Sequence, residues 1–174
     1  MRLKINRAIV NCLIRSAIET YPTETSGYLL GNHRISEASP YQCPRRSVYS
    51  VVREEKSARR VFKVVKFLGG KFVGEFHSHT GDDTGLSTDD IIAIKNLHAE
   101  LKPLGLKMKK WIEIIISVYE KRKSQSRPYI NLTQNKTNLH VTLPKSKSSV
   151  WDVNLRAYSI DIGSGHSETL KLSI

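Results

Sequence analysis

The sequence is poor in cysteine and in long apolar runs. Its 174 residues include only two cysteines, Cys12 and Cys43, which argues against a disulfide framework and suits a reducing compartment. No apolar run approaches the roughly 18 to 20 residues of a membrane span. Basic and amide side chains interrupt residues 1–20, so the unbroken apolar stretch of a secretory signal is missing. We therefore expect a soluble, cytoplasmic protein without membrane association.

Acidic residues are few relative to basic ones. The chain has 16 Asp and Glu against 28 Lys and Arg, for a formal net charge of +12. Such a charge attracts acidic partners, but charge alone does not choose among nucleic acid, a membrane surface and a protein. Aromatic residues are not interleaved with the basic ones as stacking platforms would require. We interpret the basic residues as a solvated surface and do not expect nucleic-acid binding.

Length and patterning predict one α/β domain spanning residues 1–174, because the chain is too short for two ordinary domains. Helical periodicity and cap signals predict helices between Asn6 and Pro22, over residues 54–68 and over residues 87–101. Short apolar or alternating runs predict strands at 27–31, 47–52, 71–79 and 111–120, with additional strands from about residue 127 at 129–134, 138–143, 153–160 and 168–174. This order favours a single mixed sheet flanked by helices.

Residues 75–91, EFHSHTGDDTGLSTDDI, concentrate side chains that bind metals. If residues 71–79 are extended, His77 and His79 project from the same face, about 7 Å apart along the strand. Two imidazoles can then converge on one ion, and catalytic zinc often takes two histidines, a carboxylate and a water. The candidates for the third ligand are Glu75, Asp82, Asp83, Asp89 and Asp90.

Local geometry favours Asp90 as the third ligand. Ser87 and Asp90 fit a capping box at the start of the predicted third helix, which would fix Asp90 on rigid backbone. Asp82 and Asp83 lie in a glycine-flanked loop. The alternative is that Asp90 only completes the cap and that the histidines form a polar pair on an exposed strand.

The motif H-x-H, seven residues, Ser, two residues and Asp resembles the signature of the JAMM (MPN-plus) family of zinc metalloproteases. The residues at this spacing are His77, His79, Ser87 and Asp90. The segment YPTETSGYLLG also places Glu24 after the first helix and before a glycine-flanked strand, as in that family. The order of elements is similar over roughly residues 5–120. The resemblance implies a JAMM/MPN-like fold with cytidine-deaminase-like architecture, in a compact, stand-alone member of prokaryotic or archaeal type.

Carried over to this sequence, the resemblance implies that His77, His79 and Asp90 bind Zn²⁺ with a water in the fourth position. Glu24 would be the general base, and Ser87 would help to hold the oxyanion. The implied reaction is hydrolysis of the amide bond after the C-terminal tail of a ubiquitin-like modifier. The implied partner is such a modifier or its conjugates, while the modifier's identity, the linkage and the oligomeric state stay open.

Three positions depart from the family pattern, and three alternatives remain. Thr80 and Leu86 stand where prolines are common, and Glu75 stands where relatives often have an aromatic residue; we expect a less rigid loop with the chemistry intact. Asp82 and Asp83 are interpreted as solvated loop carboxylates. The alternatives are an iron oxygenase with two histidines and one carboxylate, a non-catalytic scaffold of the same fold, and a basic nucleic-acid-binding module.

Overall fold

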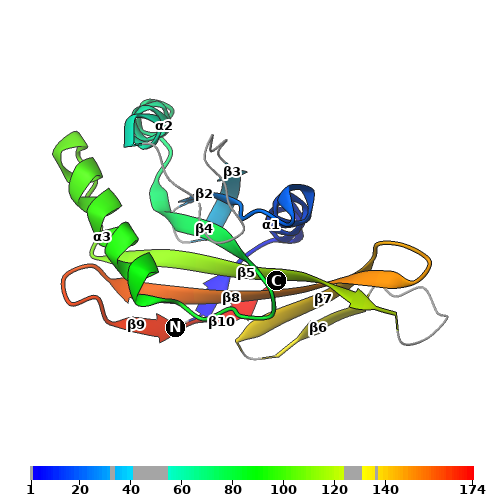
Figure 1. The fold of residues 1–174 in the computed structure, drawn as a ribbon. Coiled ribbons are helices and arrows are strands. Elements are labelled where there is room, and N and C mark those ends of the chain that lie inside the picture. Colours follow the sequence, from blue (N-terminus) through cyan, green and yellow to red (C-terminus); the bar gives the residue numbers. More distant parts are fainter. Residues whose placement is uncertain (1, 32–33, 41–54, 124–130, 136) are drawn as a thin grey trace.

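A curved mixed sheet with helices on both faces forms the body of the protein (Figure 1). The computed structural model describes residues 2–31, 34–40, 55–123, 131–135 and 137–174. The helices are α1 (Arg7–Thr20), α2 (Glu55–Phe67) and α3 (Thr88–Leu101), the last followed by the 3-10 helix η1 (Lys102–Leu104). The strands are β1 (Arg2–Lys4), β2 (Ser26–Gly31), β3 (Ile35–Pro40), β4 (Phe72–Thr80), β5 (Lys110–Arg122), β6 (Asn131–Gln134), β7 (Asn138–Pro144), β8 (Ser149–Asp161), β9 (Ser167–Thr169) and β10 (Lys171–Ser173).

The main sheet has the strand order β3-β2-β4-β5-β8-β7-β6 within the described residues, with β9 paired to β8. β4 and β5 are parallel, and α3 connects them. The other described pairs of this sheet are antiparallel. Because α3 starts soon after the C-terminal end of β4, the first turn of α3 is brought to the edge of the sheet where β4 ends.

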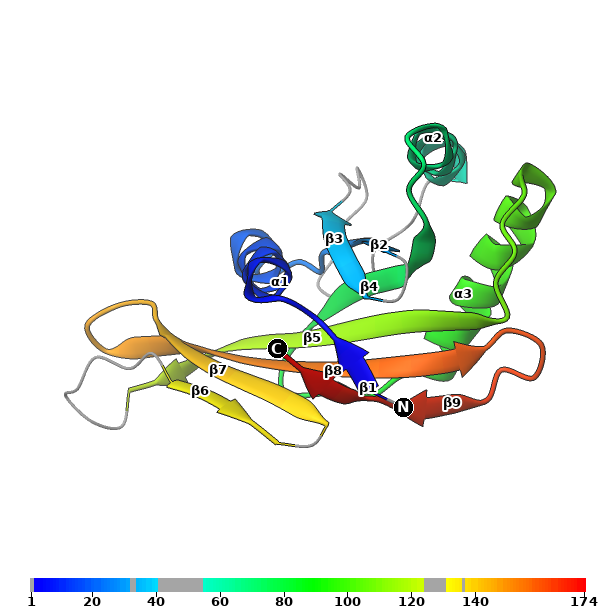
Figure 2. The ribbon, with the colours of Figure 1, turned by 180° about the vertical axis from the view of Figure 1, so that it is seen from behind.

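The sheet separates two apolar cores. One face packs against α1 and the β1–β10 pair, with Leu13, Phe76 and Ile114 fully buried. The other face packs against α2 and α3 through residues such as Leu97 and Trp111. Figure 2 shows α1 and the β1–β10 pair on the side of β5 and β8 opposite to α3. Burial on both faces explains why β5 is an almost continuous apolar run.

The structure confirms the predicted mixed α/β fold and its three helices. Asn6 caps α1 by accepting a hydrogen bond from the backbone N–H of Ile9 at 2.8 Å, and α1 ends before Pro22. Strands occur where β2, β4, β5, β6 and β7 were predicted, β8 is longer than predicted, and the predicted strand 168–174 is split into β9 and β10. The predicted strand 47–52 lies outside the described residues.

Two short strands, β1 and β3, were not predicted. Strand β3 lacks the alternation of buried and exposed residues by which a strand is recognised in a sequence, because its buried residues, Ile35 and Ala38, are three positions apart. The pairing of β2 with β3 also shifts register between Leu30 and Gly31. β1 has three residues, too few for a pattern. The extent of the domain, residues 1–174, stays a prediction. None of the described helices combines the length and apolar character needed to cross a membrane.

Gly74 allows the close approach of β4 to β5. A Cβ atom at this position would overlap the carbonyl oxygen of Ile112, and the φ angle of +157° disfavours other residues. We expect Gly74→Ala to lower the free energy of unfolding by more than about 2 kcal/mol, measured by urea denaturation with tryptophan fluorescence. Gly163→Ala, at an exposed turn, is the control and should cost less than about 0.5 kcal/mol. Equal effects of the two substitutions would contradict this account.

Candidate metal centre

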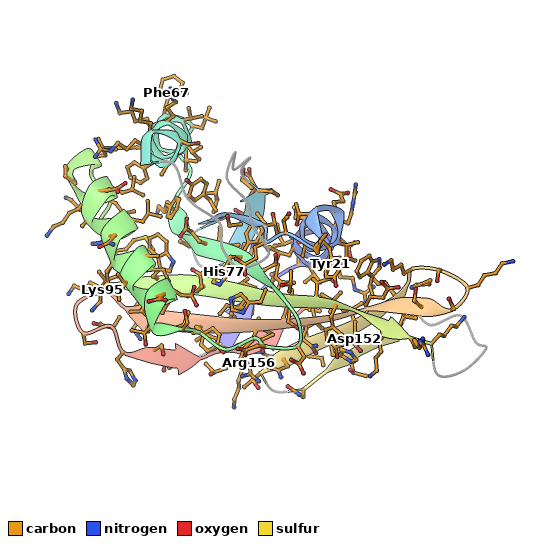
Figure 3. The ribbon with its side chains drawn as sticks, viewed as in Figure 1. Tyr21, Phe67, His77, Lys95, Asp152 and Arg156 are labelled. Carbon is orange, nitrogen blue, oxygen red and sulfur yellow. The ribbon has the colours of Figure 1, made fainter. Side chains whose placement is uncertain are left out.

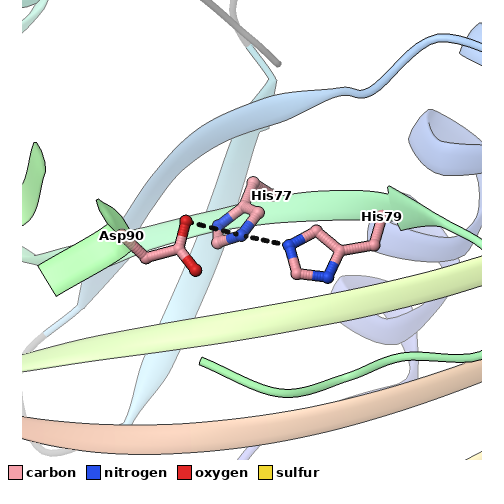
Figure 4. A group of neighbouring side chains, drawn as sticks. All are labelled: His77, His79 and Asp90. Atoms are coloured by element: carbon pink, nitrogen blue, oxygen red, sulfur yellow. Dashed lines mark hydrogen bonds and ion pairs between the residues drawn. The ribbon is translucent and has the colours of Figure 1, made fainter. Parts of the chain in front are cut away.

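Three side chains converge at the C-terminal end of β4. His77 and His79 extend from β4 and Asp90 from the first turn of α3, and their ligand atoms lie within 4.8 Å of one another (Figure 4). The Nε2 atom of His77 is 3.0 Å from Nε2 of His79 and 3.5 Å from Oδ1 of Asp90. Figure 3 shows His77, from β4, at the centre of the view with α3 to its left. Within the part of the chain that the structure describes, this group has the geometry to hold a metal ion.

Hydrogen bonds to the Nδ1 atoms orient both imidazoles. His77 Nδ1 lies 2.8 Å from Oε1 of Glu113, and His79 Nδ1 lies 3.3 Å from the carbonyl oxygen of Asp83. Because these oxygens accept, each Nδ1 is assigned the hydrogen and each Nε2 presents a lone pair. In the neutral forms, the two Nε2 lone pairs 3.0 Å apart would repel one another. The separation is favourable when a cation lies between them, either a proton, which the raised pKa of His77 favours, or a metal ion. With the oxygen of Asp90, the donor set fits zinc.

The capping box of α3 and the metal centre share Asp90. Ser87 donates its backbone N–H and its hydroxyl to Oδ2 of Asp90 at 2.8 and 2.7 Å, and the backbone N–H of Asp90 donates to Oγ of Ser87 at 3.1 Å. The cap therefore engages Oδ2, while Oδ1 faces His77. Capping and metal binding, which the sequence left as alternatives, are compatible because each uses a different oxygen.

Glu24 is held near the histidines by Ser78. The backbone N–H of Thr25 donates to Oγ of Ser78 at 2.9 Å, and the backbone N–H of Ser78 donates to the carbonyl oxygen of Thr25 at 2.8 Å. Both Ser78 and Thr25 are buried. In the antiparallel pairing of β2 with β4, Ser26 lies directly opposite His77. Glu24, two residues earlier, is thereby brought to the end of the sheet where β4 carries the histidines.

Burial and neighbouring charges shift the pKa values of Glu24, His77 and His79. Burial raises the pKa of Glu24 to about 7, with His77 lowering it and Asp90 raising it. Burial lowers the pKa of His77, but the hydrogen bond and charge of Glu113, together with the charges of Asp90 and Glu24, outweigh it, and the pKa is raised. Burial and the neighbouring His77 lower the pKa of His79. A carboxyl group that titrates near neutral pH is suited to exchange protons with water.

The other predicted candidates for the third ligand do not join the group. Asp82, Asp83 and Asp89 are exposed. Oδ1 of Asp83 accepts a hydrogen bond from the backbone N–H of Gly85 at 2.6 Å, which shapes the loop between β4 and α3. Glu75 is 2% exposed within the sheet. Of the five candidates, the structure brings Asp90 to the histidines.

Two residues at the centre were missed by sequence reasoning. Glu113 contacts His77, and its position as an acidic residue inside the apolar run of β5 was a signal that could have been used. The hydroxyl of Tyr158 in β8 donates to the carbonyl oxygen of Thr84 at 2.7 Å and fastens the loop between β4 and α3. Nothing local in the sequence relates Tyr158 to Thr84, because 74 positions separate them.

Comparisons with known proteins add information about the fold. No family model matches the sequence, and no curated protein matches it. The solution structure of protein DSY2949 from Desulfitobacterium hafniense is similar, with a TM-score of 0.58 and 14% identity over 98% of this chain and 91% of that chain. AF2198, a JAB1/MPN domain protein from Archaeoglobus fulgidus, aligns with a TM-score of 0.45 and 13% identity over 100% of both chains. At 14% identity, the first similarity shows a shared fold alone.

The raised pKa of Glu24 predicts a pH-dependent effect of Glu24→Gln on stability. The folded protein favours the protonated carboxyl of Glu24, so this group contributes to the free energy of unfolding at low pH. The contribution is lost as the pH rises from the ordinary pKa of 4.5 through the raised pKa of about 7. In metal-depleted protein, Glu24→Gln should therefore increase the free energy of unfolding at pH 8, by on the order of 1 kcal/mol because solvent screens a half-exposed group. The gain should vanish near pH 4.

Urea denaturation at several pH values measures this effect. The matched control is Glu19→Gln on the exposed side of α1, where Glu19 pairs with Arg15 at 3.2 Å. Because this substitution removes a favourable ion pair, it should not increase the free energy of unfolding at pH 8. A stabilisation by Glu24→Gln that does not grow between pH 5 and pH 8 would contradict the assignment of a raised pKa.

Proposed function

We propose that this protein is a zinc-dependent peptidase or isopeptidase of JAMM type. It hydrolyses the amide bond after the C-terminal tail of a ubiquitin-like modifier. The observation that carries the proposal is the convergence of His77 Nε2, His79 Nε2 and Asp90 Oδ1, with Glu24 electrostatically coupled to His77 and Asp90. The spacing of the two histidines, Ser87 and Asp90 in the sequence also supports a peptidase of JAMM type.

In this proposal, three side chains bind the metal ion and Glu24 transfers protons. His77, His79 and Asp90 would hold a zinc ion, which when bound would lower the pKa of water and polarise the scissile carbonyl. A carboxylate oxygen of Glu24 takes a proton from the attacking water and delivers it to the nitrogen of the leaving amine. Glu24 suits both steps because its pKa is raised to about 7 by burial. The reaction needs no nucleophilic side chain.

Ser87 has a second task in this proposal. Its hydroxyl donates to Oδ2 of Asp90, and rotation of the O–H would aim it at the oxygen of the scissile carbonyl. Removal of one such donor typically costs about 2.7 to 4 kcal/mol of transition-state stabilisation. The backbone N–H of Ser87 continues to donate to Asp90 at 2.8 Å, so Asp90 keeps a cap bond when the hydroxyl turns away.

The proposed substrate follows from the resemblance and from charge. An extended C-terminal tail can bind along an exposed strand edge by β-augmentation. Because β4 is paired with β2 and with β5, the tail would have to extend past the C-terminal end of β4 to bring its last carbonyl to the candidate metal centre. The net charge of +12 suits an acidic modifier. Long insertions of the kind that could recognise a chain of linked modifiers are absent from the sequence. We therefore propose that the substrate is a small ubiquitin-like modifier or sulfur-carrier protein.

Zinc content and cleavage test the proposal together. The substrates are ubiquitin-like proteins fused through a Gly-Gly tail to a fluorescent reporter, or linked by it to a lysine side chain. We expect Glu24→Gln to retain zinc and to lose cleavage by about 10² to 10⁴-fold, the usual contribution of a general base. Glu19→Gln, away from the centre, is the matched control and should cleave like the native chain.

The histidine variants test the metal separately. His77→Ala and His79→Ala should lose bound zinc, measured by atomic emission on purified protein. Unchanged cleavage by Glu24→Gln would remove the general base from the proposal. Full zinc occupancy in both histidine variants would show that the metal site lies elsewhere. Zinc binding without cleavage of any conjugate would favour the non-catalytic scaffold.

A further inference from the structure

Glu113 is a buried carboxyl group in an apolar strand. It lies between Ile112 and Ile114 in β5 and is 2% exposed. Both of its oxygens are engaged: Oε1 with Nδ1 of His77 at 2.8 Å, and Oε2 with the indole N–H of Trp111 at 3.0 Å. Burial of a carboxylate costs free energy that such bonds only partly offset, and an apolar residue would often stabilise the strand as well. The position therefore calls for a role other than packing.

Trp111 fixes the orientation of the Glu113 carboxyl. Because the two residues are two positions apart in β5, their side chains share a face of the sheet. Trp111 is fully buried, and its ring lies 5.4 Å from that of Phe72, which in turn contacts Tyr28 and Phe62. An indole enclosed in this way has little rotational freedom, so its N–H holds Oε2 and leaves Oε1 directed at His77.

The two histidines are supported unequally. His77 contacts a charged group on a rigid central strand at 2.8 Å, whereas His79 contacts a backbone carbonyl of an exposed loop residue at 3.3 Å. An acidic partner on Nδ1 fixes which nitrogen carries the hydrogen and makes the other nitrogen a stronger electron donor. Of the two imidazoles, His77 therefore has the environment of a preorganised ligand.

We infer that Glu113, held by Trp111, is the positioning residue of the metal centre. It keeps His77 in the Nδ1–H form with Nε2 directed at the site shared with His79 and Asp90. The inference rests on the metal site of the proposed function and is independent of the reaction catalysed there. A purely structural role for Glu113 makes a different prediction, because its loss would then change the stability of the fold and leave the zinc affinity of folded protein unchanged.

The structure provides a matched control for this test. Asp152 is 4% exposed in β8, and its Oδ1 lies 2.6 Å from Nε2 of His140. It is a buried carboxyl in contact with an imidazole, although the His140 side chain is 34% exposed, and it lies on the part of the sheet away from α3 (Figure 3). Asp152→Asn changes the same chemistry at a distance from the metal centre.

Zinc affinity is measured by competition with a chelator on folded, purified variants, and the visible spectrum of the Co²⁺-loaded protein reports ligand geometry. We expect Glu113→Gln to bind zinc about 10 to 100-fold more weakly than the native chain and to change the Co²⁺ spectrum. Trp111→Phe should weaken binding to a smaller extent, and Asp152→Asn should bind like the native chain. Urea denaturation of the metal-free forms records stability separately. Native zinc affinity in Glu113→Gln would overturn the inference.

A measurement on the native chain covers the case in which Glu113→Gln does not fold. Long-range ¹H–¹⁵N spectra identify the hydrogen-bearing nitrogen of His77, with the signal assigned by its loss in His77→Asn. We expect hydrogen on Nδ1 in metal-free and zinc-bound protein alike, and a metal-free protein with hydrogen on Nε2 but none on Nδ1 would overturn the inference. If Glu113→Gln alters the zinc affinity but the native chain cleaves no conjugate, the inference about Glu113 stands and the proposed reaction is removed. If the native chain cleaves conjugates but Glu113→Gln has native zinc affinity, the proposed reaction stands and the inference is overturned.

Discussion

Side chains in β4 alternate between the two faces of the sheet, and the candidate metal centre depends on that alternation. His77 and His79 project towards α3, where Asp90 meets them. Ser78, between them in sequence, projects to the other face and makes two hydrogen bonds with Thr25. One tripeptide thus provides two candidate ligands and also fixes the segment that carries Glu24. A shift of one residue in the pairing of β4 would reverse both functions at once.

Each proposed ligand uses one atom for the metal and another for the protein. The nitrogens and the oxygen that do not face the centre are bonded to Glu113, to the carbonyl of Asp83 and to the cap at Ser87. These bonds settle the orientation of each side chain before any ion binds, which lowers the cost of ordering the site. They also attach the centre to β5, to the loop between β4 and α3, and to the start of α3. Tyr158 fastens that loop from β8.

The centre is locally acidic in a chain of strongly positive net charge. The N-terminus of a helix disfavours a cation because its exposed N–H groups carry partial positive charge. Asp89 and Asp90 in the first turn of α3 oppose this effect, and Glu24 adds a carboxyl group that is coupled to His77 and Asp90. A divalent cation at this end of α3 therefore meets negative charge in spite of the helix dipole.

Local features could be predicted from the sequence, and contacts across the sheet could not. The caps at Asn6 and Ser87 and the alternation in β4 were readable because they involve neighbours in the chain. The short strands β1 and β3 were missed because too few residues, or an irregular register, carry their pattern. By itself, the sequence determined the helices, the common face of the two histidines, and Asp90 as the favoured candidate for the third ligand.

Only the tertiary structure decided which distant groups complete the centre. Strand pairing joins Thr25 to Ser78 across 53 positions and Glu113 to His77 across 36, and burial on both faces of β5 determines that Glu113 bonds to Trp111 and His77 instead of water. The division of labour between the two oxygens of Asp90 was decided there as well. The physical reason is that register and burial depend on the whole sheet, whereas periodicity and capping depend on a few adjacent residues.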